Sequence, residues 1–229
     1  MASFEAAVAL EADVVELDAR LTADRVPVVV HDETVDRTTD GAGEVADLAL
    51  ADIEALDAGS WFGPTFAGQR VPTLETALAY LGPRVPVTIE LKPEGFEDPA
   101  PADALEVQVV DLLRRLGIED SVVVASFEHR FLSRLARLAP RVPRGLLYYK
   151  DLDTRGAVEA CSRYGALLCH PCQALIQAED VALLQQNDLR VIPWTANDEP
   201  TMRRLLDWGV SGLVTNEVEL LQRVLEERA

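Results

Sequence analysis

The chain alternates short apolar runs, rich in Val, Ile and Leu, with longer amphipathic segments. A nearly continuous apolar run is typical of a parallel strand that is buried on both faces. The amphipathic segments between these runs have the spacing of helices that cover a sheet. Strands are therefore predicted over Asp13–Leu17, Pro27–His31, Val85–Leu91, Ser121–Ser126, Arg144–Tyr149, Ala166–His170, Arg190–Thr195 and Gly212–Thr215.

Strands that alternate with helices indicate βαβ units and a parallel sheet. Seven or eight such units in 229 residues predict an α/β fold, a TIM-type (β/α)₈ barrel at the short end of its size range. We expect one domain over residues 1–229. Examples of the predicted helices are Ala104–Leu116, Arg130–Leu138, Thr154–Tyr164, Ala178–Asn187 and Glu199–Trp208.

One connection is too short for a helical crossover. Only eight residues intervene between Asp18 and Pro27, whereas a parallel crossover needs about a dozen or more. We therefore expect an antiparallel hairpin with its turn at Asp24. In this register Glu16, Asp18 and His31 lie close together at one end of the sheet. The hairpin partner uses one predicted strand, which leaves one barrel strand unaccounted for.

Two carboxylates, Glu16 and Asp18, lie two residues apart on a predicted strand and so point to the same face. Buried carboxylates are destabilising, and a hard divalent cation, Ca²⁺ or Mg²⁺, would compensate their charge. Glu90 ends another strand, where barrel active sites gather, and can supply a third ligand. Lys92 projects to the same side. Ordinary salt bridging with Lys92 or Arg20 is an equal alternative.

Three histidines occur in the chain. His31 follows a buried valine run and is well placed for general acid or base work. A histidine that only caps the strand through a hydrogen bond is the alternative. His129 is expected at the surface near a helix start. His170, at the end of another strand, is an intermediate candidate.

Charge and cysteine content narrow the possible partners. A formal net charge of -18 argues against nucleic acid or an anionic membrane as the main partner. No long apolar run or signal peptide is visible, so no membrane span and a cytoplasmic location are expected. Cys161, Cys169 and Cys172 are expected as reduced thiols, because an odd number of cysteines in a chain without a signal peptide argues against disulfides. A structural zinc site at Cys169 and Cys172 would need a second pair of ligands.

Short motifs along the whole chain occur in a fixed order: Phe4–Ala7, Ala12–Asp18, Leu21–Asp24, Pro27–Gly41, Val71–Glu75, Ile89–Lys92, Ala125–Phe127, Pro193–Asn197 and Gly209–Asn216. Together they resemble the glycerophosphodiester phosphodiesterase family. The resemblance implies a phospholipase C-like phosphodiesterase barrel. It also implies hydrolysis of a glycerophosphodiester substrate to glycerol 3-phosphate and an alcohol.

The resemblance also implies roles for single residues. The divalent metal, Ca²⁺ or Mg²⁺, would be held by Glu16, Asp18 and Glu90. His31 would be one of two catalytic histidines. Lys92 would face the phosphate, with a part in catalysis and in substrate binding, and Trp194 would flank the glycerol side of the substrate.

The sequence departs from the family pattern at its beginning. The family opens with a strand ending in His-Arg-Gly and then Pro-Glu-Asn-Thr, and neither motif occurs here. We expect that the first strand, with the second catalytic histidine, is missing through a late start or truncation. A degenerate short relative is the alternative.

The 229-residue form is accordingly expected to show low or absent turnover. The alternatives are a non-catalytic barrel that binds metal and phosphodiester, and a related lyase or phospholipase D-type activity. The head group, the metal and the oligomeric state are not determined by the sequence.

Overall fold

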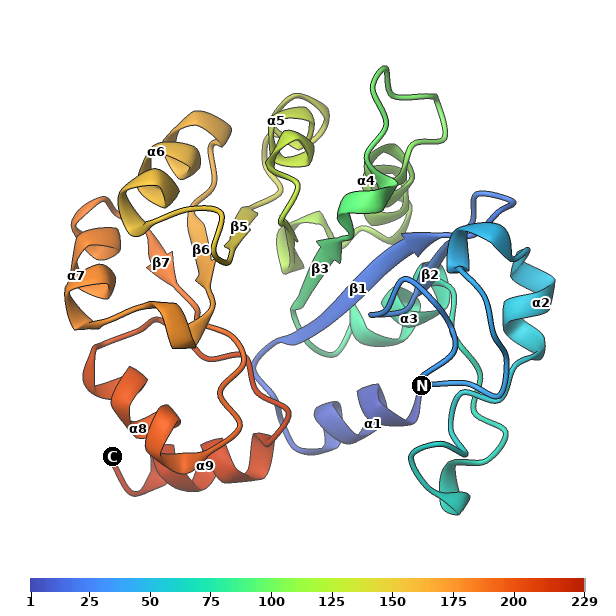
Figure 1. Ribbon diagram of the computed structural model, residues 1–229, viewed down its shortest axis with the longest axis horizontal. Coiled ribbons are helices and arrows are strands. Elements are labelled where there is room, and N and C mark those ends of the chain that lie inside the picture. The colour runs from blue at the N-terminus through green and yellow to red at the C-terminus, as the bar shows by residue number, and fades with distance from the viewer. Residues whose placement is uncertain (229) are drawn as a thin grey trace. The chain divides into compact units, whose positions relative to one another are not determined.

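The computed structural model describes residues 1–228, which form two compact units, Met1–Val123 and the residues from Val124 onward. Helices and strands alternate along much of both units (Figure 1). The predicted α/β class is therefore confirmed. The elements of the first unit are α1 (Ala2–Ala9), β1 (Val15–Leu21), β2 (Pro27–Val29), α2 (Leu50–Ala55), α3 (Leu74–Leu81), β3 (Val87–Leu91) and α4 (Leu105–Leu116).

The first unit has the strand order β2-β1-β3. β1 and β2 form the predicted antiparallel hairpin, in which Ala19 pairs with Val29. The hairpin turn is closed by the backbone N–H of Thr22, which donates to the carbonyl of Val26 at 3.1 Å. β1 continues to Leu21, beyond the predicted end, so Asp18 lies inside the strand.

β1 and β3 run parallel, with Val15 beside Val87 and Ala19 beside Leu91. All five residues of β3 are buried, as expected for a strand covered on both faces. A separate apolar cluster packs beneath the hairpin and the irregular segment after it. Its buried members are Val28, Val30, Val35, Val45, Ile53 and Val71.

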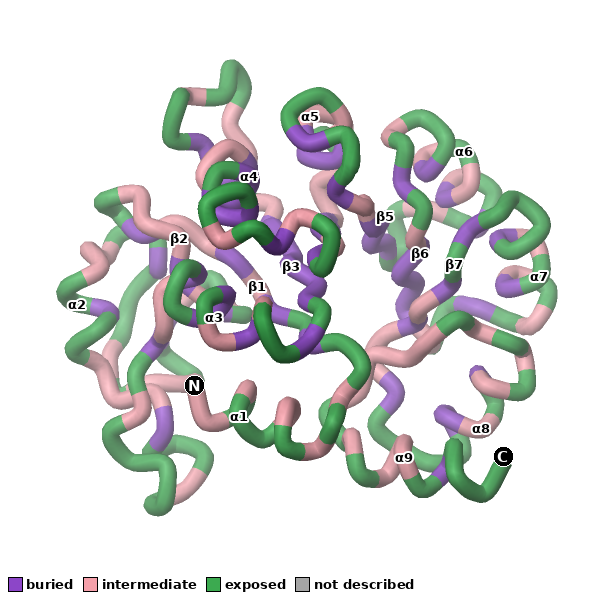
Figure 2. The backbone as a smooth tube through the Cα atoms, turned by 180° about the vertical axis from the view of Figure 1, so that it is seen from behind, coloured by how far each residue is buried: buried purple, intermediate pink, exposed green. Residues whose placement is uncertain are grey.

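The strands of the second unit are ordered β4-β5-β6-β7, and each neighbouring pair is parallel. Figure 2 shows burial concentrated on the strands and on one side of the helices, with exposed residues in the loops. The elements are β4 (Val122–Ser126), which crosses the boundary between the units, α5 (His129–Leu138), β5 (Arg144–Tyr148), α6 (Thr154–Tyr164), β6 (Leu168–Pro171), α7 (Ala178–Gln186), β7 (Arg190–Val191), α8 (Glu199–Asp207) and α9 (Val218–Glu226).

Helices of the second unit begin at side-chain caps. The carboxylates of Asp153 and Asp198 accept from the backbone N–H groups of Gly156 and Thr201 at the starts of α6 and α8. Such caps satisfy backbone donors that have no partner within the helix. Gly165 ends α6 in the left-handed conformation, where the absence of a β-carbon removes the steric penalty.

The predicted strand Gly212–Thr215 is wrong as a regular element, since these residues form no strand. Their backbone still contacts the preceding segment, because the N–H of Val214 donates to the carbonyl of Pro193 and its carbonyl accepts from Ala196. Regular β7 ends at Val191 instead of Thr195. The segment still pairs with the end of β6, because the N–H of Trp194 donates to the carbonyl of Pro171 and Trp194 forms an isolated parallel bridge with Cys172.

Segment 57–71 is irregular, with one short 3₁₀ turn, Pro64–Phe66. Its shape depends on Asp57, whose carboxylate accepts from the backbone N–H groups of Gly59, Ser60 and Gly68. Within residues 1–228, no helix is both long enough and apolar enough to cross a bilayer.

A buried glycine on β5 offers a test of the packing in the second unit. A β-carbon on Gly145 would lie 2.7 Å from Nε2 of His170 and 3.1 Å from the β-carbon of Ala125. Because overpacking forces neighbours to shift, Gly145→Ala should lower the free energy of unfolding by about 1–3 kcal/mol, measured by denaturant unfolding.

Gly212→Ala is the matched control, since its added β-carbon meets nothing closer than 3.8 Å. This control should change the free energy of unfolding by less than about 1 kcal/mol. Equal stability of the two variants would contradict the packing around Gly145.

Candidate active site

Four charged side chains lie on one face of two adjacent strands. Glu16 and Asp18 are two residues apart on β1, and Glu90 and Lys92 are two residues apart at the end of β3. The parallel register sets Asp18 directly beside Glu90. Because side chains alternate between faces along a strand, all four project to the same side.

The ammonium group of Lys92 bridges two of the carboxylates. Its Nζ lies 2.7 Å from Oδ1 of Asp18 and 2.7 Å from Oε1 of Glu90, and the Lys92 side chain is only 8% exposed. One oxygen from each of Glu16, Asp18 and Glu90 lies within 4.8 Å of the others. In the part of the chain that the structure describes, no other group of three or more potential metal ligands meets this criterion.

The pKa values show that burial, together with repulsion between the carboxylates, disfavours the ionised forms of Glu16 and Glu90. The side chain of Glu16 keeps contact with solvent, yet crowding by protein atoms raises its pKa to about 8, aided by repulsion from Asp18 and Glu90. Burial raises the pKa of Glu90 despite the attraction of Lys92. Burial alone would lower the pKa of Lys92, but Asp18 and Glu90 raise it above its ordinary value.

This arrangement suits a bound divalent cation. The three carboxylates offer oxygen ligands, which are those that Ca²⁺ and Mg²⁺ prefer. When all three are ionised, a single ammonium leaves an excess of two negative charges, which a divalent cation would balance. The structure thus brings together the three predicted ligands, and it also contains the salt bridges that were the alternative interpretation.

His31 follows β2 and has a 70% exposed side chain. Its Nδ1 lies 2.7 Å from Oδ1 of Asp32. The charge of His31 helps to lower the pKa of Glu90, so the ring is within electrostatic reach of the carboxylates. The structure therefore places His31 next to the cluster without making it a fourth ligand.

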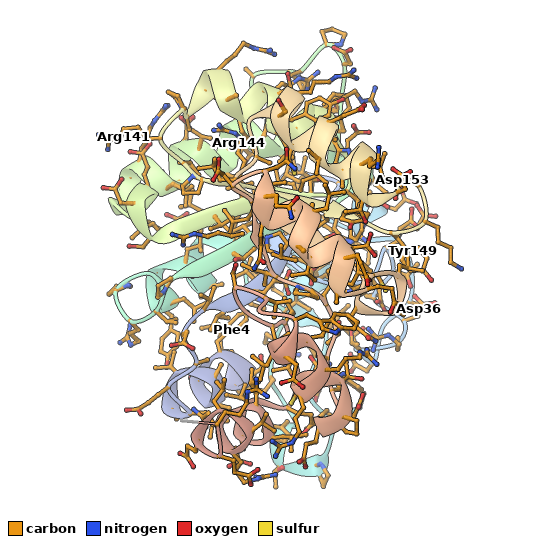
Figure 3. The ribbon with its side chains drawn as sticks, turned by 90° about the vertical axis from the view of Figure 1, so that its left-hand side faces the viewer. Phe4, Asp36, Arg141, Arg144, Tyr149 and Asp153 are labelled. Atoms are coloured by element: carbon orange, nitrogen blue, oxygen red, sulfur yellow. The ribbon has the colours of Figure 1, made fainter. Side chains whose placement is uncertain are left out.

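Trp194 belongs to the second unit, where it is part of an aromatic group. Its ring centre is 5.6 Å from that of Phe127 and 6.2 Å from that of Tyr149. The indole Nε1–H donates to the carbonyl of His170 at 2.8 Å. Tyr149, labelled in Figure 3 with Asp153, lies on the loop that leaves β5 and enters α6.

The other two histidines are held by contacts of their own within the second unit. Nε2 of His129 lies 2.8 Å from the carbonyl of Leu147, so this side chain is half-buried and not at the surface as predicted. His170 is buried, and burial lowers its pKa to about 4. All three cysteines are buried free thiols.

Sequence reasoning did not assign a role to Arg37 or to the aromatic partners of Trp194. Arg37 forms two hydrogen bonds with Asp32, and Tyr149 packs beside Trp194 although it is far from it in sequence. The motif Pro27–Gly41, which contains Arg37, was a visible signal for Arg37. For the aromatic partners, the signals were the motif Ala125–Phe127 and the position of Tyr149 at the end of a predicted strand.

The sequence and the fold of this chain are similar to those of known proteins. The model of the glycerophosphoryl diester phosphodiesterase family matches residues 1–220. The chain belongs to this family. It is 37% identical to a glycerophosphodiester phosphodiesterase of Caldanaerobacter subterraneus over 96% of the chain and 89% of that protein. It is 36% identical to one from Bacillus subtilis over 97% of the chain and 80% of that protein.

A solved structure of an Oleispira antarctica phosphodiesterase, in complex with the product sn-glycerol-3-phosphate, matches with a TM-score of 0.89. It is 25% identical, over 98% of this chain and 90% of that one. This member of the glycerophosphoryl diester phosphodiesterase family is thus an enzyme of the phosphoric diester hydrolase class with the predicted TIM-barrel fold.

The raised pKa of Glu16 predicts a pH dependence of stability in the metal-free protein. The folded-state value of about 8 exceeds the ordinary value of 4.5, so the folded state binds this proton more tightly. The resulting stabilisation is complete below the unfolded-state value and is lost as pH rises through about 8. The free energy of unfolding of the wild type, minus that of Glu16→Gln, should therefore fall as pH rises over this range.

This difference is measured by urea unfolding at a series of pH values with a chelator present. Glu54→Gln, at an exposed position of α2, is the matched control and should give a difference that is flat with pH. A flat difference for Glu16→Gln would show that its carboxyl is not crowded by the cluster.

Removing the bridging ammonium should destabilise the metal-free protein strongly. Lys92→Met leaves Asp18 and Glu90 buried without their counter-charge, and breaking a buried ion pair typically lowers the free energy of unfolding by about 3–5 kcal/mol. Denaturant unfolding checks this. Arg115→Met removes the exposed pair with Glu75 and should lower the free energy of unfolding by less than about 1 kcal/mol. Similar losses in both variants would contradict the bridging role.

Proposed function

We propose that the chain is a metal-dependent glycerophosphodiester phosphodiesterase, releasing glycerol 3-phosphate and an alcohol. The observation that carries the proposal is the cluster of Glu16, Asp18 and Glu90, in which one ammonium faces three carboxylates. Family membership and the product named in the Oleispira antarctica complex support the substrate class. Oxygen-only ligands favour Ca²⁺ or Mg²⁺ over softer metals.

The proposed roles follow from position and charge. Glu16, Asp18 and Glu90 hold the metal, which when bound supplies positive charge to the phosphodiester and to an attacking hydroxyl. Lys92 also stabilises the charge on the phosphoryl oxygens, because its ammonium stays charged and is held at the edge of the cluster by the ion pair with Asp18. His31 exchanges a proton with the substrate. Trp194 and its aromatic neighbours contact the apolar side of the glycerol group.

Low turnover of the 229-residue chain is part of the proposal. Acid/base cleavage uses two proton-transfer groups, and only His31 is close to the carboxylates within the first unit. In the second unit, Nε2 of His129 contacts the carbonyl of Leu147, and His170 is buried. The same observation favours a second candidate function, a barrel that binds metal and phosphodiester without turnover.

The proposal also covers the domain organisation, the location and the partners of the chain. We treat residues 1–229 as one functional domain, although two compact units are described. The cytoplasm is the proposed location, and a small glycerophosphodiester is the proposed ligand. Neither a nucleic acid nor an anionic membrane is proposed as a partner, because the formal net charge is -18.

The test is a calorimetric titration of chelator-treated protein with Ca²⁺ and with Mg²⁺, followed by glycerophosphocholine. Wild type should bind one of the metals, and Glu90→Gln should weaken binding by more than the roughly 10–100-fold typical of outer-sphere changes. Glu54→Gln should bind as wild type does. Absence of metal binding by the wild type would overturn the metal site.

Product analysis separates the candidate functions. Metal-dependent glycerol 3-phosphate that is lost in His31→Gln supports the phosphodiesterase, and its rate measures how far turnover is reduced. Binding without product supports the non-catalytic barrel. A cyclic phosphate product would instead indicate intramolecular attack and a lyase.

A further inference from the structure

The ring of His31 has a defined partner on one side. Its Nδ1 lies 2.7 Å from Oδ1 of Asp32. A carboxylate without a proton only accepts hydrogen bonds, so Nδ1 must donate. The hydrogen bonds from Arg37, followed by the contact with His31, hold the pKa of Asp32 well below its usual range. In the neutral ring the lone pair is then on Nε2.

Arg37 fixes the direction of the Asp32 carboxylate. Its Nε donates to Oδ2 at 2.6 Å and its Nη2 donates to Oδ1 at 2.9 Å. This two-pronged contact sets the plane of the carboxylate as well as its position. The two oxygens together therefore accept three hydrogen bonds, and Oδ1 faces both Arg37 and His31.

The backbone of His31 is fixed separately from the ring. Arg20 on β1 donates to the carbonyl of His31 from Nη2 at 3.0 Å and from Nε at 3.3 Å. Its Nη1 donates to Oε2 of Glu94 at 2.8 Å. The main chain of His31 is thus tied to β1, the strand that carries Glu16 and Asp18.

A contact on the other side of Arg37 restricts its motion. The guanidinium carbon lies 5.9 Å from the centre of the Trp61 ring, within the range of a cation–π contact. The indole Nε1–H of Trp61 donates to the carbonyl of Ala58 at 3.1 Å. The irregular segment 57–71, shaped by Asp57, therefore supports the arginine that orients Asp32.

We propose that Asp32 and Arg37 are positioning residues that hold His31 in the tautomer with the proton on Nδ1, leaving Nε2 as the proton-exchanging atom. The use of Nε2 in catalysis rests on the proposed function, whereas the tautomer itself does not. The arrangement has the logic of other carboxylate–histidine pairs, in which the carboxylate selects the ring orientation and tautomer.

If this contact had a purely structural role, its removal would lower the thermal stability and leave the tautomer of His31 unchanged. His31 and Arg37 have side chains that are 70% and 59% exposed, and exposed ion pairs add about 0–1 kcal/mol to stability. We therefore expect small changes in thermal stability when the contact is removed, together with a large change in the tautomer of His31.

The test is long-range ¹H–¹⁵N correlation NMR at alkaline pH, which distinguishes a protonated ring nitrogen from a bare one. With three histidines in the chain, the His31 signals are identified by their loss in His31→Gln. Wild type should show His31 predominantly with the proton on Nδ1. Asp32→Asn and Arg37→Gln should each shift the population markedly toward the proton on Nε2.

Arg84→Gln is the matched control, because Arg84 also lies over an aromatic ring, 4.4 Å from the centre of Tyr80, and makes no contact with Asp32. It should leave the His31 signals unchanged. A wild-type ring with its proton on Nε2, or an unchanged tautomer in Asp32→Asn and Arg37→Gln, would overturn the proposal. This readout does not need turnover, so failure of the phosphodiesterase function would be seen separately in the product assay.

Discussion

The pairing of Lys92 with Asp18 and Glu90 is the interaction on which the candidate site depends. Two carboxylates on neighbouring parallel strands can lie side by side only if a positive charge offsets their repulsion and their loss of hydration. Lys92 does this at 2.7 Å from each. The third carboxylate, Glu16, has no such ion pair, and burial, with repulsion from Asp18 and Glu90, raises its pKa to about 8. When all three carboxylates are ionised, Lys92 alone does not balance their charge. This uncompensated negative charge is the physical argument for a bound divalent metal.

The parallel register of β1 and β3 turns this local chemistry into a site. A slip of one residue would place Asp18 and Glu90 on opposite faces. The apolar residues on the other face of each strand prevent such a slip, because they are buried: Leu17 and Ala19 on β1, Ile89 and Leu91 on β3. Stability of the sheet and geometry of the site are thus secured by the same alternation of side chains.

The hairpin and the irregular segment 57–71 add the acid/base part of the first unit. The short turn returns the chain so that His31 follows β2 close to the carboxylates. Arg20, from β1, holds its carbonyl, and Asp32 holds its ring. The acidic surface of the molecule would repel an anionic phosphodiester at long range. Attraction has to arise within the site, from Lys92 and a bound cation, which agrees with the site's composition.

The sequence by itself determined the features that follow from local spacing. The spacing of two positions from Glu16 to Asp18 places both on one face, and the eight residues between Asp18 and Pro27 require a hairpin. Only the tertiary structure decided which carboxylates Lys92 joins, that Arg37 orients Asp32, and which rings surround Trp194. It also removed the predicted strand Gly212–Thr215. These features depend on contacts between distant segments and on single backbone hydrogen bonds, and the periodicity of a sequence carries no information about either.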